Sequence, residues 1–207
     1  MANFDKAHTY VVKEEGGYQD LTNDTGNYSD GLLIGTNFGI SADTLKSYLR
    51  RTPSREEMKN LSFDDAVLIY IQMYWNKILG DEIKNQSVAL LIYDGSVNQG
   101  RGAMRSVVGN AMRNLKSNID DSFVFTSSGI NQLNSLNQKE LFQEIYNGRK
   151  KRYDNGQLEF RTGHLKRLSG IVFSEKQKLP TWAIISISLG VLSLLTLSAY
   201  NIYKKTK

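Results

Sequence analysis

The segment Glu15–Ser41 reads EGGYQDLTNDTGNYSDGLLIGTNFGIS and separates two stretches of helical pattern. It is rich in Gly, Asp, Asn, Thr and Ser, which favour turns over helices. We therefore expect Gln19–Gly39 to form an irregular loop, or a small β-hairpin, over an active cleft. Before it, apolar residues at helical spacing predict a short amphipathic helix over Asn3–Glu14, and Gly16 and Gly17 would end that helix.

The stretch that follows is predicted to be helical. Ser41 is placed to cap a helix over Ala42–Arg50, and Ser62 with Asp65 three residues later marks another helix start. That second helix continues as AVLIYIQMYWNKIL, which we expect to be the central core helix. Further helices are expected from near Ser87, over Arg101–Lys116 and over Asn137–Tyr153, with a loop over Asp120–Gly129. The chain is thus predicted to be mainly α, with any sheet confined to one small hairpin.

The composition limits which kinds of functional site the chain can contain. The 207 residues include no cysteine and two histidines, which excludes disulfides and argues against a metal site, so we expect no cofactor. Residues 1–100 carry nine Lys/Arg against 14 Asp/Glu, whereas residues 101–178 carry 14 against seven. An acidic half that can hold catalytic carboxylates is joined to a basic half that suits an anionic glycan, lipid or nucleic acid.

The C-terminal tail has the character of a membrane span. Trp182–Tyr203 contains 22 residues without a charge, and as a helix it would cover about 33 Å, enough for a hydrocarbon core of about 30 Å. Aromatic residues stand at both ends and lysines flank both sides, which suits the two headgroup regions. We therefore expect a single-pass transmembrane helix over 181–203, of unresolved sidedness, in a virion membrane or a bacterial inner membrane.

Glu15 is the residue that best suits catalysis. A glycosidase needs a protonated carboxyl group to give its proton to the leaving sugar oxygen, and burial can raise the pKa of a Glu far enough. Two glycines beside it leave room for a polymer, and Tyr18 could stack on a sugar ring. The alternative reading is that Glu14 and Glu15 are solvated residues of a helix end, with Gly16 as the C-cap.

Motifs in the correct order resemble glycoside hydrolase family 108, the N-acetylmuramidases. Glu15–Tyr18 match its E-G-G-Y element, Asp24 and Gly26 match D-x-G-G, and Thr36 with Gly39–Ser41 match T-x-x-G-I-[ST]. Further matches are the tyrosine–tryptophan helix at Ile69–Trp75, the D-x-x-V-N-x-G element at Asp94–Gly100, and a closing segment with YNGRKKRY, Phe160, Gly163 and Arg167. Three departures stand out: an insertion over Tyr28–Gly35, Asn27 in place of the second glycine, and His164 in place of a tryptophan.

The resemblance implies a lysozyme-like fold with Glu15 as the general acid. Asp24 and Thr36 would assist, with Asp24 as a base for water or as an electrostatic partner of the oxocarbenium-like state. Asp20 and Asp30 compete for that role. Tyr18, Asp94 and Asn98 are candidate substrate-binding residues, although the last two could instead satisfy buried backbone groups.

The resemblance also divides the chain, into a muramidase part over 1–86, a helical peptidoglycan-binding-like part over 87–175, and the anchor. We expect a muramidase that cuts the β-1,4 bond between N-acetylmuramic acid and N-acetylglucosamine during phage lysis or wall penetration, with virion or lysis-machinery partners. The competing reading is a catalytically inactive peptidoglycan-binding membrane protein of a virion or secretion system. A nucleic-acid binder is not expected, since no recognised motif supports one, and the run Arg149–Arg152 is interpreted as a solvated helix end.

Overall fold

Polar side chains begin the first helices, as their sequence predicts. In the computed structural model, which describes residues 1–12, 16–155 and 158–175, the side chains of Asn3, Ser41 and Ser62 each accept a hydrogen bond from a backbone N–H of the first turn. These caps satisfy donors that a helix leaves without a partner. They start α1 (Phe4–Val11), α2 (Ala42–Leu49) and α4 (Phe63–Tyr70). The predicted caps at Ser41 and Ser62 are confirmed.

The Gly- and Asp-rich segment folds as the predicted hairpin. Strand β1 (Tyr28–Ser29) pairs antiparallel with β2 (Leu32–Leu33), and a 3₁₀ turn, η2 (Thr25–Asn27), precedes them. Asp30 and Gly31 connect the strands with φ of 50° and 76°. Two positive φ values in a two-residue loop match the Asp-Gly hairpin turn, whose twist suits the strands. The sequence of the insertion therefore encodes its own turn.

The core surrounds α5 (Gln86–Asn98). Nine of its 13 residues are buried, because apolar side chains occur on every side of this helix. It contacts α1, α6 (Arg101–Asn114), α8 (Gln138–Asp154) and the π-helical turn η3 (Ile71–Trp75). The remaining elements are α3 (Arg55–Lys59), η4 (Asn76–Ile78), η5 (Gly80–Glu82), η6 (Asp121–Phe123), α7 (Ser127–Ser135) and α9 (Leu158–Ser169).

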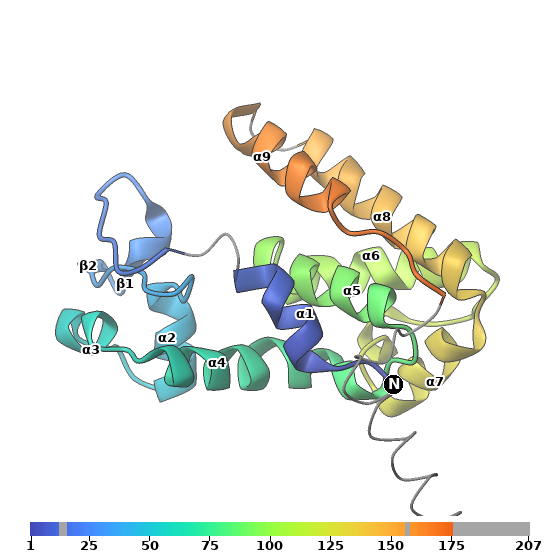
Figure 1. Ribbon diagram of the computed structural model, residues 1–207, viewed down its shortest axis with the longest axis horizontal. Coiled ribbons are helices and arrows are strands. Elements are labelled where there is room, and N and C mark those ends of the chain that lie inside the picture. Colours follow the sequence, from blue (N-terminus) through green and yellow to red (C-terminus); the bar gives the residue numbers. More distant parts are fainter. Residues whose placement is uncertain (13–15, 156–157, 176–207) are drawn as a thin grey trace, which may run out of the picture. The chain divides into compact units, whose positions relative to one another are not determined.

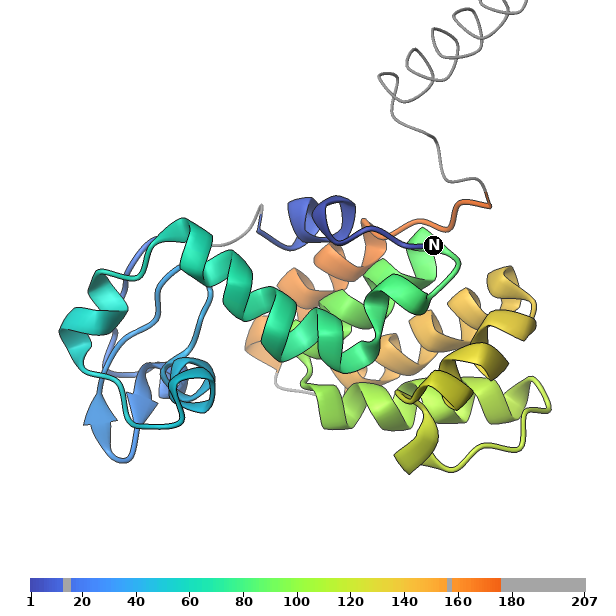
Figure 2. The ribbon, with the colours of Figure 1, turned by 90° about the horizontal axis from the view of Figure 1, so that it is seen from below.

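Within residues 1–175, which form one compact unit, the hairpin and the helical core occupy different ends. Figure 1 shows β1, β2, α2 and α3 together, with α4 running from them toward the helices that surround α5. Figure 2 shows the same path from below. Within the described residues, α4 thus connects the hairpin end to the helical core.

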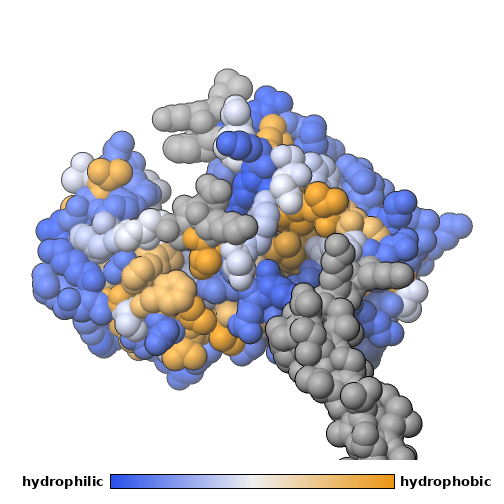
Figure 3. Space-filling view, viewed as in Figure 1, coloured by the Kyte–Doolittle hydropathy of each residue, from blue (hydrophilic) through white to orange (hydrophobic). Residues whose placement is uncertain are grey.

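The expectation that AVLIYIQMYWNKIL forms the central helix is wrong. The stretch begins within α4, continues through η3 and η4, and ends at Leu79, which has a left-handed φ of 52°. Trp75 causes part of this irregularity, since its ring packs on Gly80 so closely that a Cβ there would lie 2.3 Å away. The Trp75 indole also donates to the Asp81 carboxylate at 2.9 Å. Phe63 and Leu68 on α4 remain about half exposed. Figure 3 shows hydrophobic patches within the mostly hydrophilic surface of the face that it displays.

Several helices lie where the sequence predicted none. The predicted loop Asp120–Gly129 contains η6 and the start of α7, and α3 and α9 were not anticipated. The Thr126 side chain caps α7, and Gly129 allows the helix to pack closely on η6, because a Cβ there would lie 2.0 Å from the Phe123 carbonyl oxygen. Among the described residues, no helix combines the length and hydrophobicity that a membrane crossing requires. The predicted span at 181–203 lies outside the described residues.

Candidate active site

The segment that carries the predicted catalytic residues leaves the end of α1. Val12 caps that helix, and the described chain resumes at Gly16; Glu15, the predicted acid, lies outside the described residues. Gly16 and Gly17 are exposed, and a Cβ on either would meet nothing within 4 Å. Among the described residues, nothing therefore lies close to these two glycines, and room for a polymer beside Glu15 stays a prediction.

Gln19 connects the predicted assisting residues. Its backbone N–H and C=O pair with Thr36 at 2.8 Å each, in an antiparallel bridge. Its side-chain amide donates to Asp24 Oδ2 at 2.9 Å and to Asn27 Oδ1 at 3.0 Å, and it accepts from Asn27 Nδ2 at 2.8 Å. Gln19 is not among the site residues predicted from the sequence, where its only signal is its place in the motif segment.

Asp24 is exposed, and a hydrogen bond to each of its two carboxylate oxygens fixes its orientation. Oδ1 accepts from the backbone N–H of Gly26 at 2.9 Å, so the carboxylate also caps η2, and Oδ2 accepts from Gln19. A carboxylate offers about four acceptor sites, so an exposed one with these two bonds can still accept from water or face a positive charge. Both alternatives for Asp24, base or electrostatic partner, remain compatible with this placement.

The two competing aspartates are engaged in ion pairs. Asp20 pairs with the guanidinium of Arg55, and Asp30 pairs with Lys46 at 2.5 Å from the hairpin turn. The Asp30 carboxyl group accepts hydrogen bonds from Lys46 and from Thr52, and these lower its pKa. Asp20 and Asp30 are thus each held by a cationic side chain, whereas the two bonds to Asp24 come from an amide side chain and a backbone N–H.

Tyr18 is half-buried and held on several sides. Its hydroxyl donates to the Ile34 carbonyl at 3.2 Å and accepts from Arg55 Nε at 3.1 Å. The Lys59 ammonium lies 5.6 Å from the ring centroid, a cation–π distance. Gly35 packs on the ring, and its φ of 97° suits glycine. Stacking of this ring on a sugar stays a prediction.

A small cavity lies beside the end of α1. Its volume is about 30 Å³, and its lining includes His8, Val12, Phe38, Phe63 and Tyr70. His8 is buried, its Nδ1 lies 2.9 Å from the Tyr93 hydroxyl, and burial lowers its pKa. His8 is therefore a packed, neutral histidine near neutral pH. Among the described residues, no cluster of three His, Asp or Glu side chains could hold a metal ion.

Asp94 lies in the core rather than at a surface. Its carboxylate is fully buried and bonds Arg149 Nη2 at 2.7 Å and Arg167 Nε at 2.8 Å. Asn98 is half-buried and donates to the backbone carbonyl of Asp94 at 2.7 Å. This placement favours the structural alternative for Asp94, because a fully buried, doubly paired carboxylate has no free face for a sugar.

The interpretation of Arg149–Arg152 as a solvated helix end is wrong for its first residue. Arg149 is fully buried, whereas the three residues after it are exposed. Gly95 makes this burial feasible, because a Cβ there would lie 2.9 Å from Arg149 Nε. His164 is partly packed, with its ring stacked on Tyr153 at 4.8 Å.

Comparisons with known proteins agree with this architecture. Residues 8–100, a little under half of the chain, match the family model described as Glycosyl hydrolase 108. The solved structure of Brucella abortus SagA is similar in fold, with a TM-score of 0.69 and 24% identity over 84% of this chain and 97% of that one. No curated protein sequence matches. A mainly helical chain with a two-stranded sheet fits the lysozyme-like fold.

Proposed function

We propose that the protein is a peptidoglycan hydrolase, an N-acetylmuramidase that cleaves the β-1,4 bond between N-acetylmuramic acid and N-acetylglucosamine. One observation carries the proposal: the match to the glycosyl hydrolase model spans residues 8–100 and so includes Glu15, Asp24 and Thr36. The likeness in fold to a solved structure over most of the chain supports it.

In the proposed reaction Glu15 is the general acid and protonates the leaving glycosidic oxygen. Asp24 either activates the water or stabilises the oxocarbenium-like transition state, and Thr36 assists from the same segment. The Gln19 network supports this grouping, because one residue holds the Asp24 carboxylate by its side chain and Thr36 by its backbone. Carboxyl groups about 5–5.5 Å apart would give retention of configuration, and about 6.5–9.5 Å would give inversion.

We also propose that residues 181–203 form a single-pass membrane anchor, and that the enzyme acts in phage lysis or in wall penetration during infection. A tether would keep cleavage close to a membrane, which suits either setting. The 22 residues of Trp182–Tyr203 without a charge support the anchor.

Incubation of the full-length protein with purified peptidoglycan, followed by identification of the new reducing ends, tests the proposal. The variants are Glu15→Gln, with the neighbouring Glu14→Gln as matched control, and Asp24→Asn, with Asp20→Asn as its control. We expect muramic-acid reducing ends from the wild type, and a rate lower by about 10²–10⁴-fold in Glu15→Gln, the range of a general acid. Both control variants should retain most of the activity.

Two results would redirect the proposal. A 1,6-anhydro product would indicate a lytic transglycosylase, in which an internal hydroxyl replaces water. If neither wild type nor Glu15→Gln released fragments, yet both sedimented with the polymer, the protein would be a non-catalytic peptidoglycan-binding module.

A further inference from the structure

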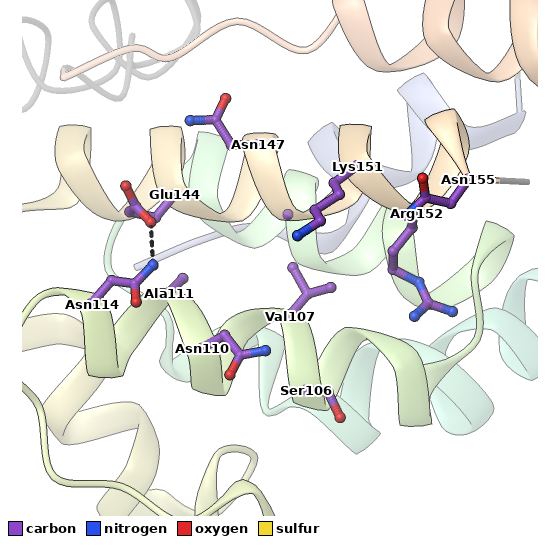
Figure 4. Close-up of a pocket in the computed structure, with 11 residues that line it drawn as sticks. Ser106, Val107, Asn110, Ala111, Asn114, Glu144, Asn147, Lys151, Arg152 and Asn155 are labelled. Atoms are coloured by element: carbon purple, nitrogen blue, oxygen red, sulfur yellow. Dashed lines mark hydrogen bonds between the residues drawn. The ribbon is translucent and has the colours of Figure 1, made fainter.

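A polar groove lies between α6 and α8, outside the segment that matches the hydrolase family model. Its volume is about 440 Å³, and Figure 4 shows its lining side chains arranged along the two helices. Most of them are polar. Four carry side-chain amides, namely Asn110, Asn114, Asn147 and Asn155. Amides both donate and accept, so the groove suits a ligand that contains peptide or N-acetyl amides.

The groove is charged differently at its two ends. At one end Glu144 accepts a hydrogen bond from Asn114 Nδ2 at 2.7 Å. Toward the other end lie Lys151 and Arg152, both exposed, and no ion pair within the described part of the chain involves either. Their neighbour Lys150 differs, since it pairs with Asp154 at 3.1 Å. The groove therefore offers one carboxylate and two available cations.

The groove floor is narrow and carries no aromatic ring. Val107, Ala111 and Gly148 form its apolar part, and a Cβ on Gly148 would lie 2.9 Å from Val107 Cγ1. Single-stranded nucleic acids bind on stacking rings in cationic channels, so the carboxylate and the absence of rings among the lining residues argue against them. Amides and paired charges suit a peptide better than a sugar face.

We propose that this groove binds a short peptide that carries a free amino group near one end and a carboxylate near the other. Glu144 and Lys151 are seven positions apart on α8, about 10 Å along its axis, which an extended peptide covers with about three residues. This inference rests on the proposed function, because the peptide stems of peptidoglycan have this chemistry: a diamino acid followed by a terminal carboxylate. The amino group would face Glu144, and the carboxylate would face Lys151 and Arg152.

Calorimetric titration of the full-length protein with three probes tests this inference. The probes are the tetrapeptide L-alanyl-γ-D-glutamyl-meso-diaminopimelyl-D-alanine, the same peptide acetylated on its side-chain amine, and a chitin tetrasaccharide. The groove variant is Lys151→Ala with Arg152→Ala. Its matched control is Lys139→Ala with Lys150→Ala, which removes two exposed charges of the same helix outside the groove.

We expect the tetrapeptide to bind the wild type and to bind the groove variant about tenfold or more weakly, as for the loss of charge-assisted hydrogen bonds. The control variant should bind within about twofold of wild type, because Lys139 and Lys150 do not line the groove. Acetylation should also weaken binding. Equal binding by both double variants, no tetrapeptide binding, or binding of the tetrasaccharide in a way that depends on Lys151 and Arg152 would each overturn the inference.

The proposed hydrolase activity is measured separately, on glycan strands from which the stems have been removed. The groove variant should cleave these strands at the wild-type rate, since the groove lies outside the catalytic segment. Cleavage without tetrapeptide binding would refute the groove alone, whereas tetrapeptide binding without any cleavage would refute only the proposed activity.

Discussion

Replacing Arg149 with methionine should be among the most damaging single changes in the described core. The Arg149 guanidinium is fully buried, and it donates to the Leu91 carbonyl at 2.9 Å, to Asp94 Oδ2 at 2.7 Å and to the Tyr153 hydroxyl at 3.1 Å. The first two bonds join α8 to α5, and the third lies within α8. Methionine fills a similar volume, so the loss is mainly one of charge and hydrogen bonds rather than of packing.

The expected cost follows from what Asp94 retains. Arg167 and Asn98 would still bond its carboxylate, but the buried charge would lose its shortest partner. Removing one member of a buried ion pair costs about 3–5 kcal/mol when the other charge is left uncompensated, and the retained Arg167 should keep the cost near the lower end of this range. Domains of this kind have about 5–15 kcal/mol of stability in total. A loss near 3 kcal/mol would remove between about a fifth and three fifths of the free energy of unfolding.

Urea unfolding of the full-length protein, followed by far-ultraviolet circular dichroism, measures this loss. Lys150→Met is the matched control, since this exposed neighbour makes only a surface ion pair and should cost less than about 0.5 kcal/mol. A cost below about 1 kcal/mol for Arg149→Met, or a cost no larger than that of Lys150→Met, would refute the reasoning.

Two further predictions concern the hairpin and α1. Gly35→Ala should lower the free energy of unfolding by about 2 kcal/mol or more, because the residue has a positive φ and a Cβ would lie 2.5 Å from the Tyr18 ring. The control Gly102→Ala should not destabilise the protein, because a Cβ there would meet nothing within 4 Å. Equal losses of stability for the two variants in urea unfolding would contradict this prediction. Burial lowers the pKa of His8 in the folded protein below its usual 6.5. As the pH falls, the unfolded chain therefore takes up a proton on His8 before the folded protein does. The free energy of unfolding should then decrease as the pH falls below about 6.5. His8→Phe should flatten the pH dependence of unfolding between about pH 5 and 7, and an unchanged slope would contradict the assignment.

The parts of the fold that the sequence predicted correctly depend on local chemistry. Ser41 and Ser62 cap helices because a hydroxyl reaches backbone N–H groups only three residues away. The Asp30–Gly31 turn is equally local, since both residues tolerate positive φ. Such signals need no knowledge of distant segments.

The parts that could not be predicted depend on contacts between distant residues. The run Arg149–Arg152 appears uniformly solvated, yet Asp94, 55 positions earlier, draws its first residue into the core. Gln19 likewise acquires its role only when the chain turns back to bring Thr36 beside it. α5 is central because it is buried on every side. Short-range periodicity cannot predict this, since a strongly apolar helix at the surface would show the same sequence pattern.

The departures from the family motif in the hairpin region belong to one structural unit. Asn27, which replaces a glycine, is fully buried, and its side chain donates to Gln19 Oε1 and to the Leu21 carbonyl. Its own carbonyl accepts from Ile34 at 2.8 Å and from Gly35 at 2.9 Å, so Asn27 closes the base of the inserted hairpin. A glycine has no side chain and could not make the first set of bonds. The asparagine therefore attaches the insertion to Gln19, the residue that orients Asp24.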